Sequence, residues 1–333
     1  MTTISLIKTT SYLPGKPIDT TFFGSQNDIN EGFIQKGKYR HHIAEHESAA
    51  DMIVNASSKL IEQLNLEPTK DIDIILTNVS LPDQPFNGCG VEVKYRLGAN
   101  AQWVFDIHNT GCVSFIMLMT LAQSLMTSSR AKTALICCAQ TAAGRIFADP
   151  QIRSRPEACI PGDGCAVGYL VANAESPVKA MVHQSYGEFA TDMNLVSDDK
   201  RQWWQNREAA LYLDLSEDRI PKIMIRGNRI VPRVIKECCQ AAGILPSHLN
   251  ALITNQPNPT FLRNWREALE LPKEAQIETY DDHGNLFGAA IPISFEKGIQ
   301  EGRIKKNDYI ALGGFSHAGD FAASAIIHWQ AGL

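Results

Sequence analysis

A single cysteine stands where a polar turn becomes a long apolar stretch, in the segment DIHNTGCVSFIMLM at residues 106–119. The stretch after Cys112 is apolar on almost every side, which is typical of a helix buried on all faces. Cys112 would lie at the start of that helix, where unpaired N–H groups and the positive helix end favour a thiolate. Because a thiolate attacks carbonyl carbons, the segment predicts a nucleophile that takes up an acyl group. The alternative is a buried, inert thiol that fills space.

Two asparagines occupy comparable places elsewhere in the chain. Asn285, in YDDHGNLFGAAIPISFEKGI, precedes a helix expected to begin near Leu286, and Asn255 ends the strand in LITNQPNPTFLRNW. An asparagine amide at such a place can donate a hydrogen bond to a substrate oxygen. The structural alternatives are an N-cap or turn at Asn285 and a simple end of the strand at Asn255.

Paired glycines in ALGGFSHAGD, at residues 311–320, could bring backbone close to a ligand. We expect the N–H group of Gly314 to form an oxyanion hole together with the N–H group of Cys112. A bulge at the end of a strand is the structural alternative for the glycines.

The elements that must position these groups occur twice. Two pairs of segments each run through a helix, a turn and an apolar strand, and a third pair consists of a Gly-Asp turn and a strand: 48–78 with 231–255, 121–141 with 294–316, and 162–172 with 319–329. Strands that alternate with helices predict parallel βαβ units, with helices covering both faces of continuously apolar strands. The sequence therefore predicts an α/β fold of two pseudo-symmetric halves, with a site at their junction.

Composition limits the classes of function. The net charge of −5 over 333 residues gives no reason to expect a nucleic acid or an anionic membrane as partner. The N-terminus lacks the apolar core of a signal peptide, and no apolar stretch reaches the roughly 18 residues that span a bilayer, so we expect a cytoplasmic protein. The eight cysteines form no CxxC motif and show no metal-ligand spacing. We therefore expect no metal, and seven buried, reduced thiols besides Cys112.

Several motifs, in their order along the chain, resemble β-ketoacyl-acyl carrier protein synthase III and related thiolase-fold condensing enzymes. They are RHHIAEHESAADM (40–52), Cys112 at its buried helix, PGDGCAVGYLV (161–171), NQPNPTF (255–261), DHGNLFGAAIP (282–292) and EGRIKKNDYIALGGF (301–315). The resemblance covers nearly the whole chain and implies a five-layered αβαβα fold, with thiolase-like halves at 1–173 and 174–333. It also implies a homodimer and a ping-pong reaction, in which an acyl thioester loads onto Cys112. The acyl group then passes to a second substrate, in the family usually a malonyl-carrier that decarboxylates.

One departure from the family pattern concerns the catalytic residues. Where the family has His in a His-Gln-Ala-Asn motif, this chain has Asn255, so the expected triad is Cys112, Asn255 and Asn285. Asparagine can donate to an enolate or thioester oxygen, but it cannot accept a proton, and a lost general base typically costs ~10²–10⁴ in rate. His317 and His108 are therefore candidates for a substitute base.

The expected activity is acyl transfer, with acyl-coenzyme A or an acyl carrier protein as substrate and no further cofactor. Arg263 and Arg266, on the helix after NQPNP, could bind an acidic carrier protein. The more common alternative is that such residues are simply charged side chains exposed to solvent on a helix. The expected pathway is specialised or fatty-acid-related metabolism. The alternative is a non-catalytic or half-active partner subunit, in a heterodimer with a complete condensing enzyme. A plain thiolase or a hydroxymethylglutaryl synthase would need a second catalytic Cys or a catalytic Glu, and neither can be assigned.

Overall fold

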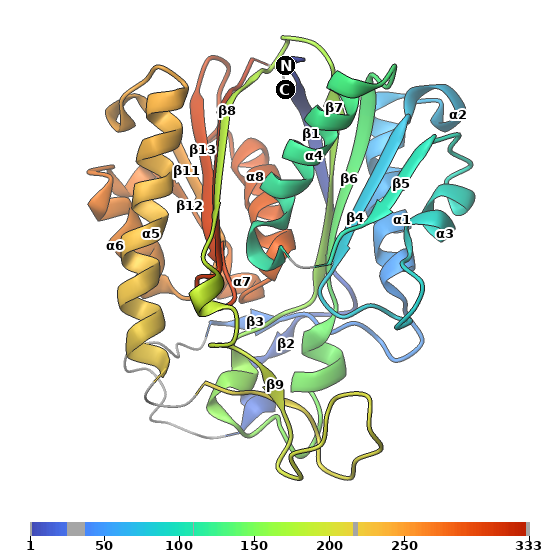
Figure 1. Ribbon diagram of the computed structural model, residues 1–333, viewed down its shortest axis with the longest axis vertical. Helices are drawn as coiled ribbons and strands as arrows, with labels where there is room; N and C mark the ends of the chain where they lie inside the picture. Colours follow the sequence, from blue (N-terminus) through green and yellow to red (C-terminus); the bar gives the residue numbers. More distant parts are fainter. Residues whose placement is uncertain (1, 25–36, 109, 216–218, 331–333) are drawn as a thin grey trace.

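Two five-stranded mixed sheets form the body of the protein, in a computed structural model that describes residues 2–24, 37–108, 110–215 and 219–330 (Figure 1). The strand order is β1-β7-β6-β4-β5 in the first sheet and β12-β11-β13-β14-β8 in the second. The first sheet comprises β1 (Ser5–Tyr12), β4 (Ile74–Val79), β5 (Trp103–Asp106), β6 (Thr133–Gln140) and β7 (Gly164–Val171). The second comprises β8 (Val178–Ser185), β11 (Ala251–Thr254), β12 (Gln276–Ile277), β13 (Tyr309–Ser316) and β14 (Phe321–His328).

The central strands pair in parallel, as the alternation of strands and helices predicted. β4 pairs in parallel with β5 and β6, and β11 pairs in parallel with β12 and β13. The remaining pairs of each sheet run antiparallel. Every residue of β4 and of β11 is buried, because helices cover both faces of these strands.

The helices form three layers around the two sheets (Figure 1). The middle layer, between the sheets, holds α4 (Ser114–Ser128) and α8 (Ala290–Gln300), and one hydrophobic core joins their side chains to both sheets. The first sheet is covered on its outer face by α1 (Ala49–Leu64) and α3 (Gly90–Arg96). The second is covered by α5 (Arg219–Ala241) and α6 (Pro259–Ala268). The predicted αβαβα order is therefore confirmed.

The middle layer explains the apolar stretch after Cys112. Within the described residues, Gly111–Ser128 is the one helical segment long and apolar enough to cross a membrane by length and composition, with a mean hydropathy of 1.4. No such segment was expected from the sequence, because polar residues interrupt the apolar stretch. The helix instead packs between the two sheets, and Phe115, Leu118 and Met119 are completely buried there.

The two halves repeat the same arrangement, as predicted. β5, β4, β6, β7 and β1 occupy the same positions in the first sheet as β12, β11, β13, β14 and β8 in the second. The chain passes from the first sheet to the second between Val171 and Val178. Because one core spans both sheets, the division into separate units at 1–173 and 174–333 stays a prediction.

Several of the shorter elements lie at the end of the molecule where α4 and α8 begin. Two small two-stranded sheets, β2–β3 and β9–β10, lie there beyond the ends of the large sheets (Figure 1). The remaining elements are β2 (Ile18–Asp19), β3 (Tyr39–Arg40), β9 (Leu195–Val196), β10 (Tyr212–Leu213), the helices α2 (Pro68–Asp71) and α7 (Tyr280–His283), the π-helix η3 (Ala143–Phe147), and the 3₁₀ turns η1 (Thr20–Phe23), η2 (Gly111–Val113), η4 (Pro156–Cys159), η5 (Gly187–Phe189), η6 (Pro246–His248), η7 (Lys273–Ala275) and η8 (Phe287–Ala289). The small sheets were not predicted from the sequence.

Candidate active site

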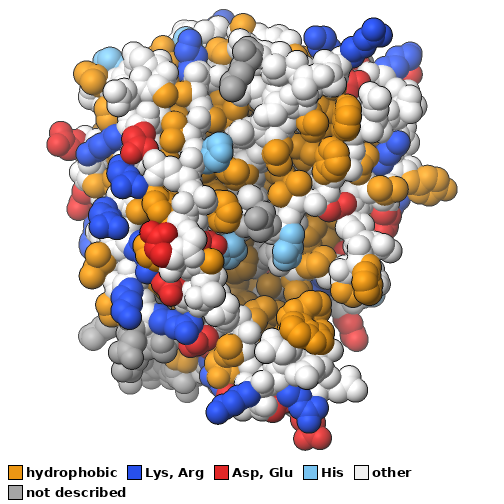
Figure 2. Space-filling model, viewed as in Figure 1, with side chains coloured by type: hydrophobic (Ala, Val, Ile, Leu, Met, Phe, Trp, Pro, Cys, Tyr) orange, Lys and Arg blue, Asp and Glu red, His pale blue; other side chains and the backbone are white. Residues whose placement is uncertain are grey.

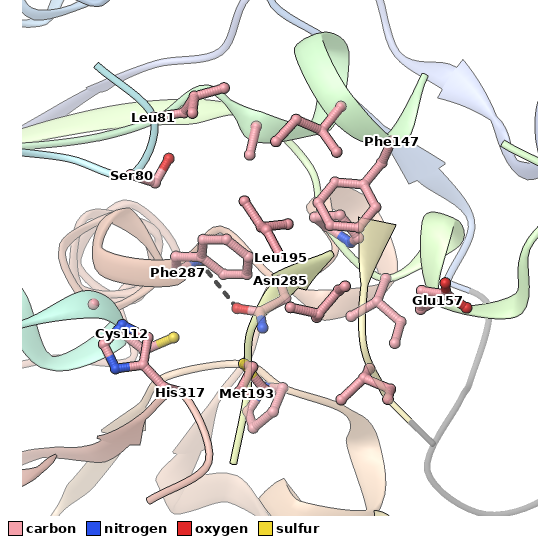
Figure 3. Close-up of a pocket in the computed structure, with 18 of the residues that line it drawn as sticks. Ser80, Leu81, Cys112, Phe147, Glu157, Met193, Leu195, Asn285, Phe287 and His317 are labelled. Carbon is pink, nitrogen blue, oxygen red and sulfur yellow. Dashed lines mark hydrogen bonds between the residues drawn. The ribbon is translucent and has the colours of Figure 1, made fainter. Parts of the chain in front are cut away.

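A pocket of about 260 Å³ lies at the end of the molecule where α4 and α8 begin (Figure 3). Its lining includes five predicted site residues: Cys112, Asn255, Asn285, His108 and His317. These residues come from both halves of the chain, so the pocket lies at the junction that the internal repeat indicated. Gly314, Arg263 and Arg266 are not part of its lining.

Cys112 lies in a single 3₁₀ turn, η2, directly before α4. The turn is tied to β13 of the other half, because the Val113 backbone N–H donates to Ser316 Oγ at 3.1 Å and that hydroxyl donates to the Thr110 carbonyl at 2.6 Å. Cys112 is partly exposed, on the pocket side. The other seven cysteines are free and buried, as expected.

The Cys112 thiol is not held as a thiolate. Burial raises the pKa of Cys112 to about 12, and hydrogen bonds from the Asn255 side chain and the His317 backbone lower it only in part. The nearby carboxylate of Asp320 raises the pKa further. The expectation that the helix start alone favours a thiolate is therefore wrong, because the protein atoms around the sulfur remove most of the water that would solvate its charge.

Asn255 pairs with the backbone of β13 through both ends of its amide. Its Nδ2 donates to the Phe315 carbonyl at 3.1 Å, and its Oδ1 accepts from the Phe315 N–H at 3.3 Å. A Cβ on Gly314 would lie 2.3 Å from Asn255 Oδ1, so this close approach requires glycine. Gly314 therefore lies behind Asn255, and its predicted part in an oxyanion hole stays a prediction.

Asn285 is fixed by the segment around Pro161. The Asn285 backbone N–H donates to the Ile160 carbonyl at 2.9 Å, and its carbonyl accepts from the Gly162 N–H at 3.2 Å. Its Oδ1 accepts from the Phe287 N–H at 3.0 Å, which is the dashed line in Figure 3. Among the described residues the Asn285 Nδ2 has no partner, so its hydrogens can reach a substrate oxygen.

The two candidate bases differ in their surroundings. His317 lies with its Nδ1 3.0 Å from both carboxylate oxygens of Asp320. A Cβ on Gly111 would lie 2.9 Å from His317 Nε2, so the imidazole lies directly over the turn that carries Cys112. His108 is exposed and also lines a second surface pocket, and no carboxylate among the described residues binds its ring. Asp320 was not singled out from the sequence, although its spacing from His317 in SHAGD was visible there.

The remaining wall of the pocket is mostly apolar. Phe147, Met193, Leu195 and Phe287 contribute to it, with the carboxyl group of Glu157 at the end opposite Cys112 (Figure 3). Figure 2 shows apolar side chains gathered on this face of the molecule, with histidines near its centre. Burial raises the pKa of Glu157. The β9–β10 segment that supplies much of this wall was missed in the sequence.

Residues outside this pocket line two other hollows of the surface. Trp203 and Trp204 are largely exposed and line one of them. Arg263 and Arg266 line a shallow surface groove that also contains Lys273 and Arg303. Glu274 and Glu278 line the same groove, and its use by an acidic carrier protein stays a prediction.

Two regions of the chain match models of one protein family. Residues 105–187 match 3-oxoacyl-[acyl-carrier-protein (ACP)] synthase III, and residues 239–329 match the C-terminal part of the same family. The first region contains Cys112, and the second contains Asn255, Asn285 and His317. Fold and site together place the chain in the thiolase-fold class that includes the condensing enzymes.

Whole-chain comparisons agree with this class. The chain is 29% identical over 300 residues to β-ketoacyl-[acyl-carrier-protein] synthase III of Clostridium perfringens, over 87% of this chain and 88% of the relative. Its fold matches the crystal structure of β-ketoacyl-[acyl carrier protein] synthase III from Thermus thermophilus with a TM-score of 0.82 at 22% identity, over 98% and 100% of the two chains. It also matches the priming β-ketosynthase of the R1128 polyketide biosynthetic pathway, with a TM-score of 0.84 at 18% identity, over 99% and 97%. The chain belongs to the 3-oxoacyl-ACP synthase III family and is a synthase III-like acyltransferase.

Proposed function

We propose that this acyltransferase takes an acyl group from a thioester onto Cys112 and passes it to a second substrate, in specialised or fatty-acid-related metabolism. The observation that carries the proposal is one apolar-walled pocket that joins Cys112 to the amides of Asn255 and Asn285 from the opposite half. An apolar wall suits an acyl chain, and the polar groups at one end suit a thioester.

Each polar residue has a proposed role. The Cys112 sulfur attacks the thioester carbonyl, and the oxygen that becomes negative accepts hydrogen bonds from the N–H groups of Cys112 and Gly314. Asn285 donates its amide hydrogens to a substrate oxygen. Asn255 donates to the sulfur, which supports its negative charge when the proton leaves. The proposal includes that Asn255 stands where the family has its catalytic histidine.

The acyl donor and the oligomeric state follow from the family and from the surface. The proposed donor is acyl-coenzyme A or an acyl carrier protein. The names of the relatives contain the carrier protein, and Arg263 and Arg266 are its proposed contacts. We propose a homodimer through β5, which is the edge strand of the first sheet. Phe86, Tyr95 and Phe105 are exposed around that edge, where Figure 2 shows apolar side chains. The proposed compartment is the cytoplasm.

Intact-mass measurement tests the acyl-enzyme. We would incubate the purified protein with acetyl-, hexanoyl- and decanoyl-coenzyme A and with the same chains on a carrier protein. We expect the mass of one acyl group on the wild type and none on Cys112→Ala, with Cys138→Ala as the matched control because Cys138 is fully buried in β6. An adduct that persists in Cys112→Ala, or no adduct from any donor, would overturn the proposal.

The alternative of a partner subunit makes a different prediction. A half-active subunit would load Cys112 but turn over only when a complete condensing enzyme is added. Repeated turnover by the purified chain alone would exclude it.

A further inference from the structure

We propose that His317 and Asp320 complete a Cys112–His317–Asp320 array, in which His317 Nε2 accepts the proton of a hydroxyl or amine that receives the acyl group. This inference rests on the proposed acyl-Cys112 intermediate and adds to it the class of acceptor. It makes the second half-reaction an ester- or amide-forming transfer, in place of a carbon–carbon condensation.

The first support is the orientation of the imidazole. Both carboxylate oxygens of Asp320 lie 3.0 Å from His317 Nδ1, so Nδ1 carries the hydrogen and Nε2 carries the lone pair. The Asp320 side chain is only 13% exposed, which keeps this hydrogen bond away from competing water. The result is the carboxylate–imidazole arrangement that orients a general base.

The second support is the position of Nε2 relative to the nucleophile. Gly111 has a φ of +45° and no side chain, and a Cβ there would lie only 2.9 Å from Nε2. The imidazole therefore lies against the residue that precedes Cys112, and the His317 backbone also donates a hydrogen bond to the Cys112 thiol. Both residues line the same pocket (Figure 3).

The third support is the strained turn that holds the imidazole there. His317 has a φ of +49°, a left-handed conformation that costs a non-glycine residue roughly 1 kcal/mol. The turn is closed by the Gly319 N–H, which donates to the Ser316 carbonyl at 2.8 Å, and by Arg226, which donates to the Ala318 carbonyl at 2.6 Å and pairs with Asp192. Unfavourable backbone that the surroundings enforce in this way is concentrated at functional sites.

The fourth support is the small number of free hydrogen-bond donors in the site. Decarboxylation of a malonyl group needs free donors for the enolate oxygen, but the Asn255 amide is already bonded to Phe315 and to the Cys112 sulfur. Of the two asparagines only Asn285 is left to donate to that oxygen, one donor side chain where the family resemblance implies two. A hydroxyl or amine acceptor needs instead a base that removes its proton as it attacks, and His317 supplies that base.

The same base serves both half-reactions. With a thiol pKa of about 12, only ~10⁻⁵ of Cys112 is a thiolate at pH 7. In loading, Nε2 takes the Cys112 proton, the sulfur attacks the thioester carbonyl, and the departing thiolate of the donor takes that proton. In transfer, Nε2 takes the proton of the acceptor O–H or N–H, and the oxygen or nitrogen bonds to the acyl carbon. The carbon–sulfur bond then breaks, and the Cys112 thiolate recovers the proton.

Alkylation of Cys112 by iodoacetamide at pH 7.5 tests the base without any acyl substrate. The test variant is His317→Gly, because glycine accepts the φ of +49° and leaves a space for free imidazole. We expect the alkylation rate to fall at least ~10-fold and to recover when imidazole is added. His46→Gly is the matched control, because His46 is exposed and lies outside the pocket lining, and it should alkylate like the wild type. A His317→Gly rate equal to wild type, or a fall that imidazole does not restore, would overturn the role of His317.

The positioning role of Asp320 has its own readout. Asp320→Asn should slow alkylation in the wild type but add nothing further in His317→Gly, because both variants remove the same unit. Equal effects of Asp320→Asn in the two backgrounds would show a purely structural role. Thermal melts of each variant establish that it is folded.

The lifetime of the acyl-enzyme tests the class of acceptor. Hexanoyl-Cys112 would be mixed with glycerol, glycinamide or malonyl-coenzyme A and followed by intact mass. We expect glycerol or glycinamide to shorten the lifetime at least ~10-fold in the wild type but not in His317→Gly. Equal lifetimes in both proteins with every probe, or release of a 3-oxoacyl product from malonyl-coenzyme A, would overturn the proposal. If no acyl-enzyme forms at all, the proposed function fails, while the alkylation experiment still reports on the base.

Discussion

Gly314→Ala should disturb the site by displacing the side chain of Asn255. A Cβ on Gly314 would lie 2.3 Å from Asn255 Oδ1 and 2.9 Å from Asn255 Cγ. Because β13 is buried and paired on both sides, the Asn255 side chain must move, and its two hydrogen bonds to Phe315 break. The Cys112 sulfur loses its amide donor at the same time.

The magnitude follows from these contacts. Overpacking a buried site costs about 1–3 kcal/mol, and two lost hydrogen bonds cost about 0.5–1.5 kcal/mol each, which gives about 2–6 kcal/mol in total. For a chain of 333 residues the entropy of unfolding is about 0.7 kcal/mol per kelvin, so the melting temperature should fall by about 3–9 °C. Alkylation of Cys112 should slow as well, because its pKa rises further when the donor is lost.

Differential scanning calorimetry with two further variants decides whether the reasoning holds. Gly187→Ala is the matched control, since a Cβ there meets no atom within 4 Å and its φ is ordinary, and its melting temperature should stay within about 1 °C of wild type. In an Asn255→Ala background, Gly314→Ala should cost much less, because the clashing Oδ1 and Cγ atoms are gone. Equal melting temperatures for Gly314→Ala and Gly187→Ala, or additive losses in the double variant, would refute this account of Gly314.

Four other variants test separate statements about the molecule. Asn285→Asp keeps the acceptor for the Phe287 N–H but loses the donor to substrate, so acyl loading should slow by ~10²–10³ with little loss of stability; loading at the wild-type rate would contradict this. Burial lowers the pKa of His42 to about 4, so the wild type loses stability as the pH falls below about 6.5, by ~2 kcal/mol at pH 5. His42→Phe has no imidazole to protonate and should not show this loss. In urea denaturation, the difference in free energy of unfolding between the variant and the wild type should shift by this amount, in favour of the variant, from pH 8 to pH 5. Tyr95→Lys should convert the dimer into a monomer in light scattering, and a monomeric wild type would disprove the β5 interface. Arg263→Glu should raise KM for an acyl group on a carrier protein and leave KM for acyl-coenzyme A unchanged; equal changes would count against carrier binding.

The sequence located residues whose position follows from a periodic pattern. Cys112, Asn255 and Asn285 stand where a strand ends or a helix begins, and the topology of α/β folds brings such points together. Asp320 was missed because it lies in an irregular turn, where neither the helical nor the strand period predicts the direction of a side chain. The state of the Cys112 thiol depends on how much water surrounding atoms remove, which no local pattern reveals. The wall from β9 and β10 was missed because these strands are only two residues long.

The Ser316 hydroxyl has a consequence for how the two repeats can change over evolution. It bonds to the turn before α4 on both sides of Cys112, at Thr110 and at Val113, although it belongs to the other repeat. Because Asn255 is bonded to the neighbouring Phe315, the turn that carries the sulfur and the Asn255 amide are both tied to β13. The repeats can drift apart in sequence, but their mutual orientation is fixed at the point where the reaction takes place.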